Sequence, residues 1–101
     1  MILDHIAIQV KDIEKSVAWY KSNLNADTLY CDETWAMLKI GNAKLALTIA
    51  SQHPPHLGFA VDDVKKIPSP DGIHRDGSVY KYIEDPDGNT IEYVYYPEKS
   101  S

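Results

Sequence analysis

The sequence has little that would support a disulfide scaffold, a membrane span or a nucleic-acid interface. It contains one cysteine, Cys31, so no disulfide can form within the chain. Its longest apolar runs are far too short to cross a bilayer. Lys and Arg number 10 against 15 Asp and Glu, which gives a net charge of −5, and the basic residues are dispersed. This balance opposes binding to phosphate backbones. Because the chain also enters a strand-like run without a signal segment, we expect a cytoplasmic protein.

Length and composition favour one globular domain. A chain of 101 residues should bury roughly 60–70% of its unfolded surface, which is enough for one core but not for two. Apolar residues make up 44% of the chain and charged residues 25%, as in ordinary globular proteins. We therefore expect a single domain over residues 1–101.

Two segments of the chain resemble each other, and each begins with a histidine. Residues 5–12 read HIAIQVKD and residues 56–63 read HLGFAVDD. In each segment bulky apolar residues alternate with small or polar ones, as in a strand with two different faces. The bulky face should pack on a core, and the other face should line a hollow. We therefore expect His5 and His56 to point into the hollow from equivalent strands.

The first half of the chain predicts a β-α-β-β-β unit over residues 1–50. Asp12 can cap a helix that runs to about Leu24, and its apolar residues recur along one face. Asn25 suits a left-handed stop. Three β-prone runs follow, at residues 28–31, 34–40 and 44–50.

The second half repeats this pattern over residues 56–97, after a proline-containing linker at residues 51–55. A short helical turn is expected at residues 64–67, a turn-rich segment at 71–77, and strands at 78–84 and 90–96. The predicted fold is α+β, with two βαβββ repeats forming a cupped mixed sheet and the second repeat shortened.

Glu92 lies in the middle of the last predicted strand, where a charge is disfavoured unless it is solvated or has a partner. Strand parity puts it on the same side as His5 and His56. Two imidazoles and one carboxylate with open positions suit a divalent metal that also binds substrate or water. Taken singly, each residue is better explained by a hydrogen-bonded histidine or a solvated carboxylate. A pocket that has lost its metal is a further alternative.

The sequence resembles the vicinal oxygen chelate superfamily, which includes glyoxalase I, bleomycin-resistance proteins, fosfomycin-resistance enzymes and extradiol dioxygenases. The resemblance covers nearly the whole chain. It is carried by the two histidine-initiated repeats, the run DPDGNTIE at residues 85–92, and SVAWY at residues 16–20 in the predicted helix.

The resemblance implies that His5, His56 and Glu92 are metal ligands, for a divalent ion such as Ni, Mn, Zn or Fe. Glyoxalase I would have a fourth, carboxylate ligand at the position aligned with Ala46. The set of two histidines and one glutamate instead resembles that of fosfomycin thiol transferases and extradiol dioxygenases. The resemblance also suggests a homodimer.

Two functions from different classes follow as hypotheses. One is a metal-dependent lyase, isomerase, dioxygenase or thiol transferase acting on a small substrate with vicinal oxygens, with Glu92 also as the catalytic group. The alternative is a non-catalytic protein of the bleomycin-resistance kind that sequesters a small aromatic ligand. Residues that could contact either ligand lie on the hollow face, in the turn-rich segment or among the aromatics, and they are Thr48, Trp35, His74, Arg75 and Tyr82.

Overall fold

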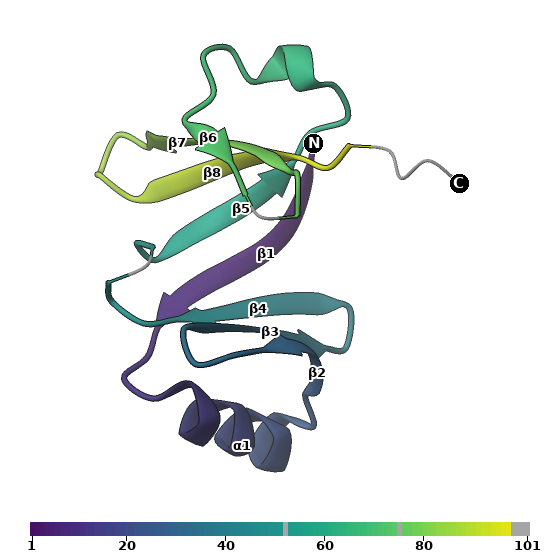
Figure 1. Cartoon of the computed structure of the whole chain (residues 1–101), viewed down its shortest axis with the longest axis vertical. Coiled ribbons are helices and arrows are strands. Elements are labelled where there is room, and N and C mark those ends of the chain that lie inside the picture. The colour runs from purple at the N-terminus through teal and green to yellow at the C-terminus, as the bar shows by residue number, and fades with distance from the viewer. Residues whose placement is uncertain (52, 75, 98–101) are drawn as a thin grey trace. The chain divides into compact units, whose positions relative to one another are not determined.

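The structure is a computed structural model that describes residues 1–51, 53–74 and 76–97 (Figure 1). Its strands and helices form two compact units. One unit is His5–His56, and the other combines Met1–Asp4 with the chain from Leu57 onward. No helix within the described residues is both long and apolar enough to cross a membrane.

The unit His5–His56 has one helix and strands in the order β2-β3-β4-β1. β1 runs parallel to β4, whereas β2 with β3 and β3 with β4 are antiparallel. These elements follow the predicted β-α-β-β-β order. Their bounds are β1 Ile2–Gln9, α1 Ile13–Leu24, β2 Asp27–Cys31, β3 Trp35–Ile40 and β4 Ala43–Thr48.

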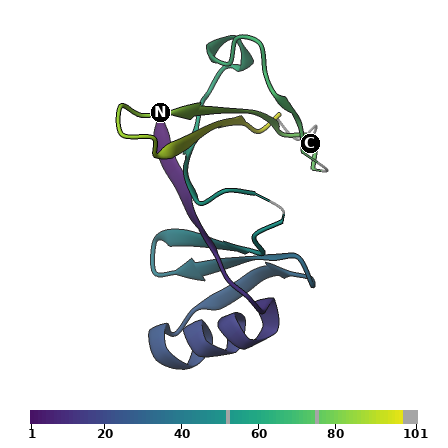
Figure 2. The ribbon, with the colours of Figure 1, turned by 90° about the vertical axis from the view of Figure 1, so that its left-hand side faces the viewer.

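Helix α1 begins and ends at the residues that the sequence predicted. The Asp12 carboxylate accepts a hydrogen bond from the backbone N–H of Lys15 at 3.0 Å, and Asn25 ends the helix with φ 57°. The helix covers one face of β2, β3 and β4 (Figure 2). There Ile13 packs into a core with Leu38 and Leu47, both of which have no exposed surface. Helix α1 therefore packs its apolar face on the sheet, as the spacing of its apolar residues predicted.

The second unit has the strand order β5-β8-β7-β6, with β5 parallel to β8. Its bounds are β5 His56–Ala60, η1 Val64–Lys66, β6 Gly72–Ile73, β7 Val79–Glu84 and β8 Thr90–Tyr95. A single 3₁₀ turn, η1, stands where the first unit has a helix. Strand β6 lies in the segment predicted as turn-rich. It has only two residues, so it shows no alternation, and it exists because Gly72 pairs with Tyr80 on β7.

The expected α+β class, mixed strand pairing and shortened second repeat are confirmed. Strand register also aligns the two repeats residue by residue. Ala7 pairs with Ala46, and the equivalent Gly58 pairs with Glu92. Ala46 therefore holds the place of Glu92, as the sequence alignment assumed.

Candidate metal centre

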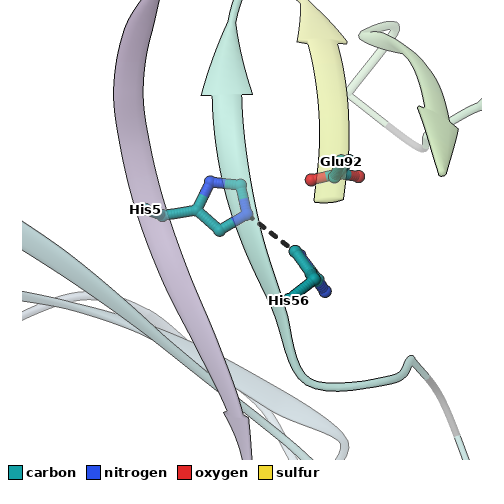
Figure 3. Close-up of side chains that lie close together, drawn as sticks. All are labelled: His5, His56 and Glu92. Carbon is teal, nitrogen blue, oxygen red and sulfur yellow. Dashed lines mark hydrogen bonds between the residues drawn. The ribbon is translucent and has the colours of Figure 1, made fainter. Parts of the chain in front are cut away.

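Two buried histidines, His5 on β1 and His56 at the start of β5, lie directly against each other. Their exposed fractions are 7% and 8%. The Nε2 atoms are 3.2 Å apart, and the dashed line in Figure 3 joins the two rings. The rings meet edge to face, with an angle of 84° between their planes. Each ring therefore presents its Nε2 atom to the other.

The partner of His56 on its other side determines which of its nitrogens carries the proton. Nδ1 of His56 lies 2.7 Å from the carbonyl oxygen of Pro54. Because a carbonyl oxygen only accepts, Nδ1 must be the donor. A neutral His56 ring then has a lone pair on Nε2, directed at His5. An outward Nε2 lone pair with an anchored Nδ1–H is the arrangement that metal-ligating histidines adopt.

The separation of the two nitrogens is suited to a shared metal ion. Metal–nitrogen bonds are about 2.0–2.1 Å long, so two ligands 3.2 Å apart subtend about 100° at the ion. This angle lies between octahedral and tetrahedral values. To become neighbouring ligands, the two rings would lose the hydrogen bond between them, and the proton on Nε2 of His5 would have to leave or move to Nδ1.

Glu92 on β8 is 2% exposed, so its carboxylate needs a partner. Its Oε2 lies 2.9 Å from Nε2 of His74. The strand partner of Glu92 on β5 is Gly58, two residues after His56. Because residues two apart share a strand face, Glu92 faces the same way as His56.

His5 and His56 offer two ligand nitrogens within the unit His5–His56, and Glu92 offers a buried carboxylate in the second unit; Figure 3 draws the three side chains. Imidazoles with a carboxylate suit Zn, Fe, Ni or Mn, and three protein ligands leave positions open on the ion. The donor set therefore fits a catalytic divalent metal.

Thr48 and Trp35 lie in the first unit as a pair across β4 and β3. Thr48 is 4% exposed, with its hydroxyl 3.5 Å from the carbonyl oxygen of Ile8. The half-buried Trp35 ring stacks on Tyr30, with ring centroids 4.5 Å apart. Both belong to the face that carries Ala46, opposite the face that α1 covers. Their contact with a ligand stays a prediction.

Tyr82 and His74 lie beside Glu92, whereas Arg75 lies outside the described residues. Tyr82 is the strand partner of Glu92 on β7. Burial, reinforced by the negative charge of Glu92, raises the pKa of Tyr82 above its ordinary range, so its hydroxyl keeps its proton. His74 lies in a bend after β6 and binds Glu92 directly. The His74 side chain is thus partly exposed and at the same time bound to a buried carboxylate.

One further residue at this site, Tyr80, was not predicted from the sequence. Its ring stacks on His74 with centroids 4.0 Å apart and planes at 12°. Tyr80 lies in a run of alternating aromatics on β7, a pattern that equally describes core packing. The stack depends on the hairpin of β6 with β7, which local sequence does not reveal.

Comparison with known proteins supplies the family. The model of the Glyoxalase/Bleomycin resistance protein/Dioxygenase superfamily matches residues 2–69. The chain belongs to this superfamily. The chain is 29% identical over 111 residues to the metallothiol transferase FosB of Staphylococcus epidermidis. This match covers 89% of this chain and 78% of FosB.

Solved structures show the same fold for this superfamily member. The methylmalonyl-CoA epimerase of Mycobacterium tuberculosis superposes with a TM-score of 0.77 and 18% identity, covering 95% of this chain and 88% of the epimerase. A variant of the Streptomyces coelicolor epimerase, in complex with 2-nitronate-propionyl-CoA, gives a TM-score of 0.78 and 18% identity and covers 97% and 99%. At this identity the likeness concerns the fold alone.

Proposed function

We propose that this superfamily member is a metal-dependent enzyme that holds one divalent ion through His5, His56 and Glu92. The observation that carries the proposal is the 3.2 Å separation of the two imidazole nitrogens, with the other nitrogen of His56 bound to the Pro54 carbonyl. The buried carboxylate of Glu92 and the family membership support it. The substrate would be a small molecule with adjacent oxygens or a related oxyanion.

The chain's own residues would prepare the site for such a substrate. The bound ion would supply a Lewis acid that stabilises negative charge on the substrate oxygens. His56 stays oriented through Pro54, and Glu92 contributes one carboxylate oxygen. Ala46 places no ligand at the fourth position, which leaves room for the substrate. Tyr82 keeps its hydroxyl proton and can donate a hydrogen bond.

Among the reactions of this superfamily we favour thiol transfer. Two features support this choice: the relative named as a metallothiol transferase, and the absence of a ligand side chain at Ala46. Isomerase chemistry is the next candidate because several of the structural neighbours are epimerases, although they share only the fold. The reaction can be assayed by supplying a low-molecular-weight thiol with a small phosphonate or epoxide acceptor.

A sequestering protein is the second candidate function. The observation that favours it is the stacked pair of Tyr30 and Trp35, which offers a planar aromatic surface on β2 and β3. Such a protein would bind a small aromatic ligand and would not require metal. Fluorescence of the tryptophans during titration with planar aromatic compounds would detect it, and binding unaffected by a chelator would favour it over the enzyme.

We also propose a cytoplasmic homodimer. β2 is exposed along its whole length at one edge of its unit, and exposed edges are commonly covered or paired. Sedimentation at micromolar protein concentration would distinguish dimer from monomer. A single monomeric species would refute this part of the proposal.

Calorimetric titration tests the metal site. Protein stripped with a chelator should bind one equivalent of nickel, manganese or zinc, and a His5→Ala, His56→Ala double variant should lose this binding. His53→Ala is the matched control, because His53 precedes β5 and contributes a backbone oxygen, not its ring, to the contact with Gln9. Saturable binding of equal affinity in the double variant would refute the site.

A further inference from the structure

The hairpin of β6 and β7 carries a histidine to the carboxylate of Glu92. Nε2 of His74 lies 2.9 Å from Oε2 of Glu92, and the two side chains are 29% and 3% exposed. A carboxylate without a proton only accepts, so Nε2 of His74 is the donor. One of the two oxygens of Glu92 is thus already engaged by the protein.

The imidazole of His74 is held in place from its other side. Tyr80 stacks on it almost in parallel, at 4.0 Å between centroids. Tyr80 in turn lies over Gly72, its strand partner on β6. A Cβ at residue 72 would come within 3.0 Å of the Tyr80 hydroxyl oxygen. Gly72 therefore makes room for the ring that holds His74.

Hydrogen bonds also hold the backbone of the bend that contains His74. Its N–H donates to the carbonyl of Ser78 at 2.8 Å, and its carbonyl accepts from the N–H of Gly77 at 2.9 Å. The carboxylate of Asp76 accepts from both the N–H and the hydroxyl of Ser78, at 2.8 and 2.6 Å. Gly77 has φ 89°, a conformation that favours glycine. The bend thus presents His74 in one orientation.

We propose that His74 is a positioning residue that holds Oε2 of Glu92 and so limits this carboxylate to binding metal through its other oxygen. The inference rests on the function proposed above. A carboxylate can bind an ion through one oxygen or two, and a hydrogen bond to one oxygen favours the first. Ligation through one oxygen leaves a further position on the ion for substrate.

Two substitutions of His74 separate hydrogen bonding from packing. His74→Leu fills similar space without a donor, whereas the side-chain amide of His74→Gln can still donate to Glu92. Outer hydrogen-bond partners of metal ligands typically contribute about 10–100-fold to affinity. We expect His74→Leu to weaken nickel binding by about that factor and His74→Gln to recover most of it.

The cobalt form provides a readout that a purely structural role would not change. The visible absorption of bound Co²⁺ reports its coordination number and geometry. It should change in His74→Leu, where Glu92 can turn both oxygens to the ion, and return towards wild type in His74→Gln. Tyr80→Phe is the matched control, because it keeps the stacked ring and removes only a hydroxyl, and it should leave affinity and spectrum unchanged.

Gly72→Ala should perturb the hydrogen bond between His74 and Glu92 without changing His74 itself. It should displace the Tyr80 ring and shift the cobalt spectrum in the same direction as His74→Leu, and it provides the test if His74→Leu does not fold. If the wild type binds metal and His74→Leu matches it in affinity and spectrum, His74 is not a positioning residue and the proposed function stands. If the wild type binds no metal, the proposed function fails and this inference fails with it.

Discussion

Ala46 and Glu92 occupy the same register position in the two repeats. Ala46 on β4 pairs with Ala7 on the parallel strand β1, and Glu92 on β8 pairs with Gly58 on the parallel strand β5. Both positions are buried, at 5% and 2% exposure. One repeat thus places a methyl group where the other places a carboxylate, so the first repeat offers no carboxylate at the position equivalent to Glu92.

Replacing Ala46 with Glu should have opposite effects on stability with and without metal. In a three-ligand site a fourth oxygen donor should tighten nickel binding, and nickel should then raise the melting temperature of the variant more than that of wild type. Without metal the buried carboxylate lacks a cation, and desolvation should destabilise the fold by roughly 1–3 kcal/mol. Differential scanning fluorimetry with and without nickel measures both effects.

Ala46→Gln controls for size, because it adds nearly the same volume without charge. It should destabilise the metal-free protein less than Ala46→Glu and gain less from nickel. A loss of stability in Ala46→Glu that nickel leaves unchanged would contradict the metal enzyme and favour the sequestering protein.

Helix α1 could be predicted from sequence because its signals are local. The Asp12 cap, the apolar spacing from Ile13 and the stop at Asn25 all lie within or beside the helix. Strand β6 could not be predicted, since its two residues become a strand only by pairing with β7. Local propensity has no access to a pairing of this kind.

The candidate site likewise has one part that the sequence could predict and one part that it could not. The sequence repeat and the two-residue period of a strand predicted that His5 and His56 share a face, and their ring nitrogens are in contact. The bond from His74 to Glu92 joins residues 18 apart and depends on the conformation of the bend between β6 and β7. Sequence therefore proposed the ligand set but not the residue that holds one of its members.

Removing the helix cap should destabilise the first unit by a modest amount. Asp12→Ala deletes the acceptor for the Lys15 N–H, and such substitutions cost about 0.5–2 kcal/mol. Asp12→Asn retains a side-chain oxygen and should restore most of the loss. Urea unfolding followed by circular dichroism gives both values, and equal stability of Asp12→Ala and wild type would show that the cap contributes nothing measurable.

Tyr82 should resist ionisation at alkaline pH. Burial and the charge of Glu92 raise its pKa in the folded protein, so the neutral hydroxyl stabilises the fold below the ordinary tyrosine pKa of 10.0. That contribution is lost as pH rises from there towards the raised value. Tyr82→Phe should therefore show a smaller alkaline loss of stability than wild type in denaturation experiments across this range. Parallel losses in the two proteins would contradict the buried hydroxyl.

The stability that Asp32 contributes should depend on pH in the opposite sense, and the change should occur at acid pH. Its carboxylate accepts hydrogen bonds from the Tyr30 hydroxyl at 2.5 Å and from the backbone N–H of Thr34 at 2.7 Å. These bonds, led by that of Tyr30, lower the pKa of Asp32 below its ordinary value of 3.8. Its stabilising contribution is thus present above that value and is lost as pH falls towards the lowered pKa.

Asp32→Asn, which keeps the shape but not the charge, should be less stable than wild type at neutral pH, and the difference should shrink as pH falls below about 4. Glu33→Gln, a neutralisation at the exposed neighbouring position, is the control for a general change in net charge. Urea midpoints measured from neutral to strongly acid pH give the comparison. A stability difference between wild type and Asp32→Asn that stays constant across this range would show that the lowered pKa of Asp32 does not contribute to folding.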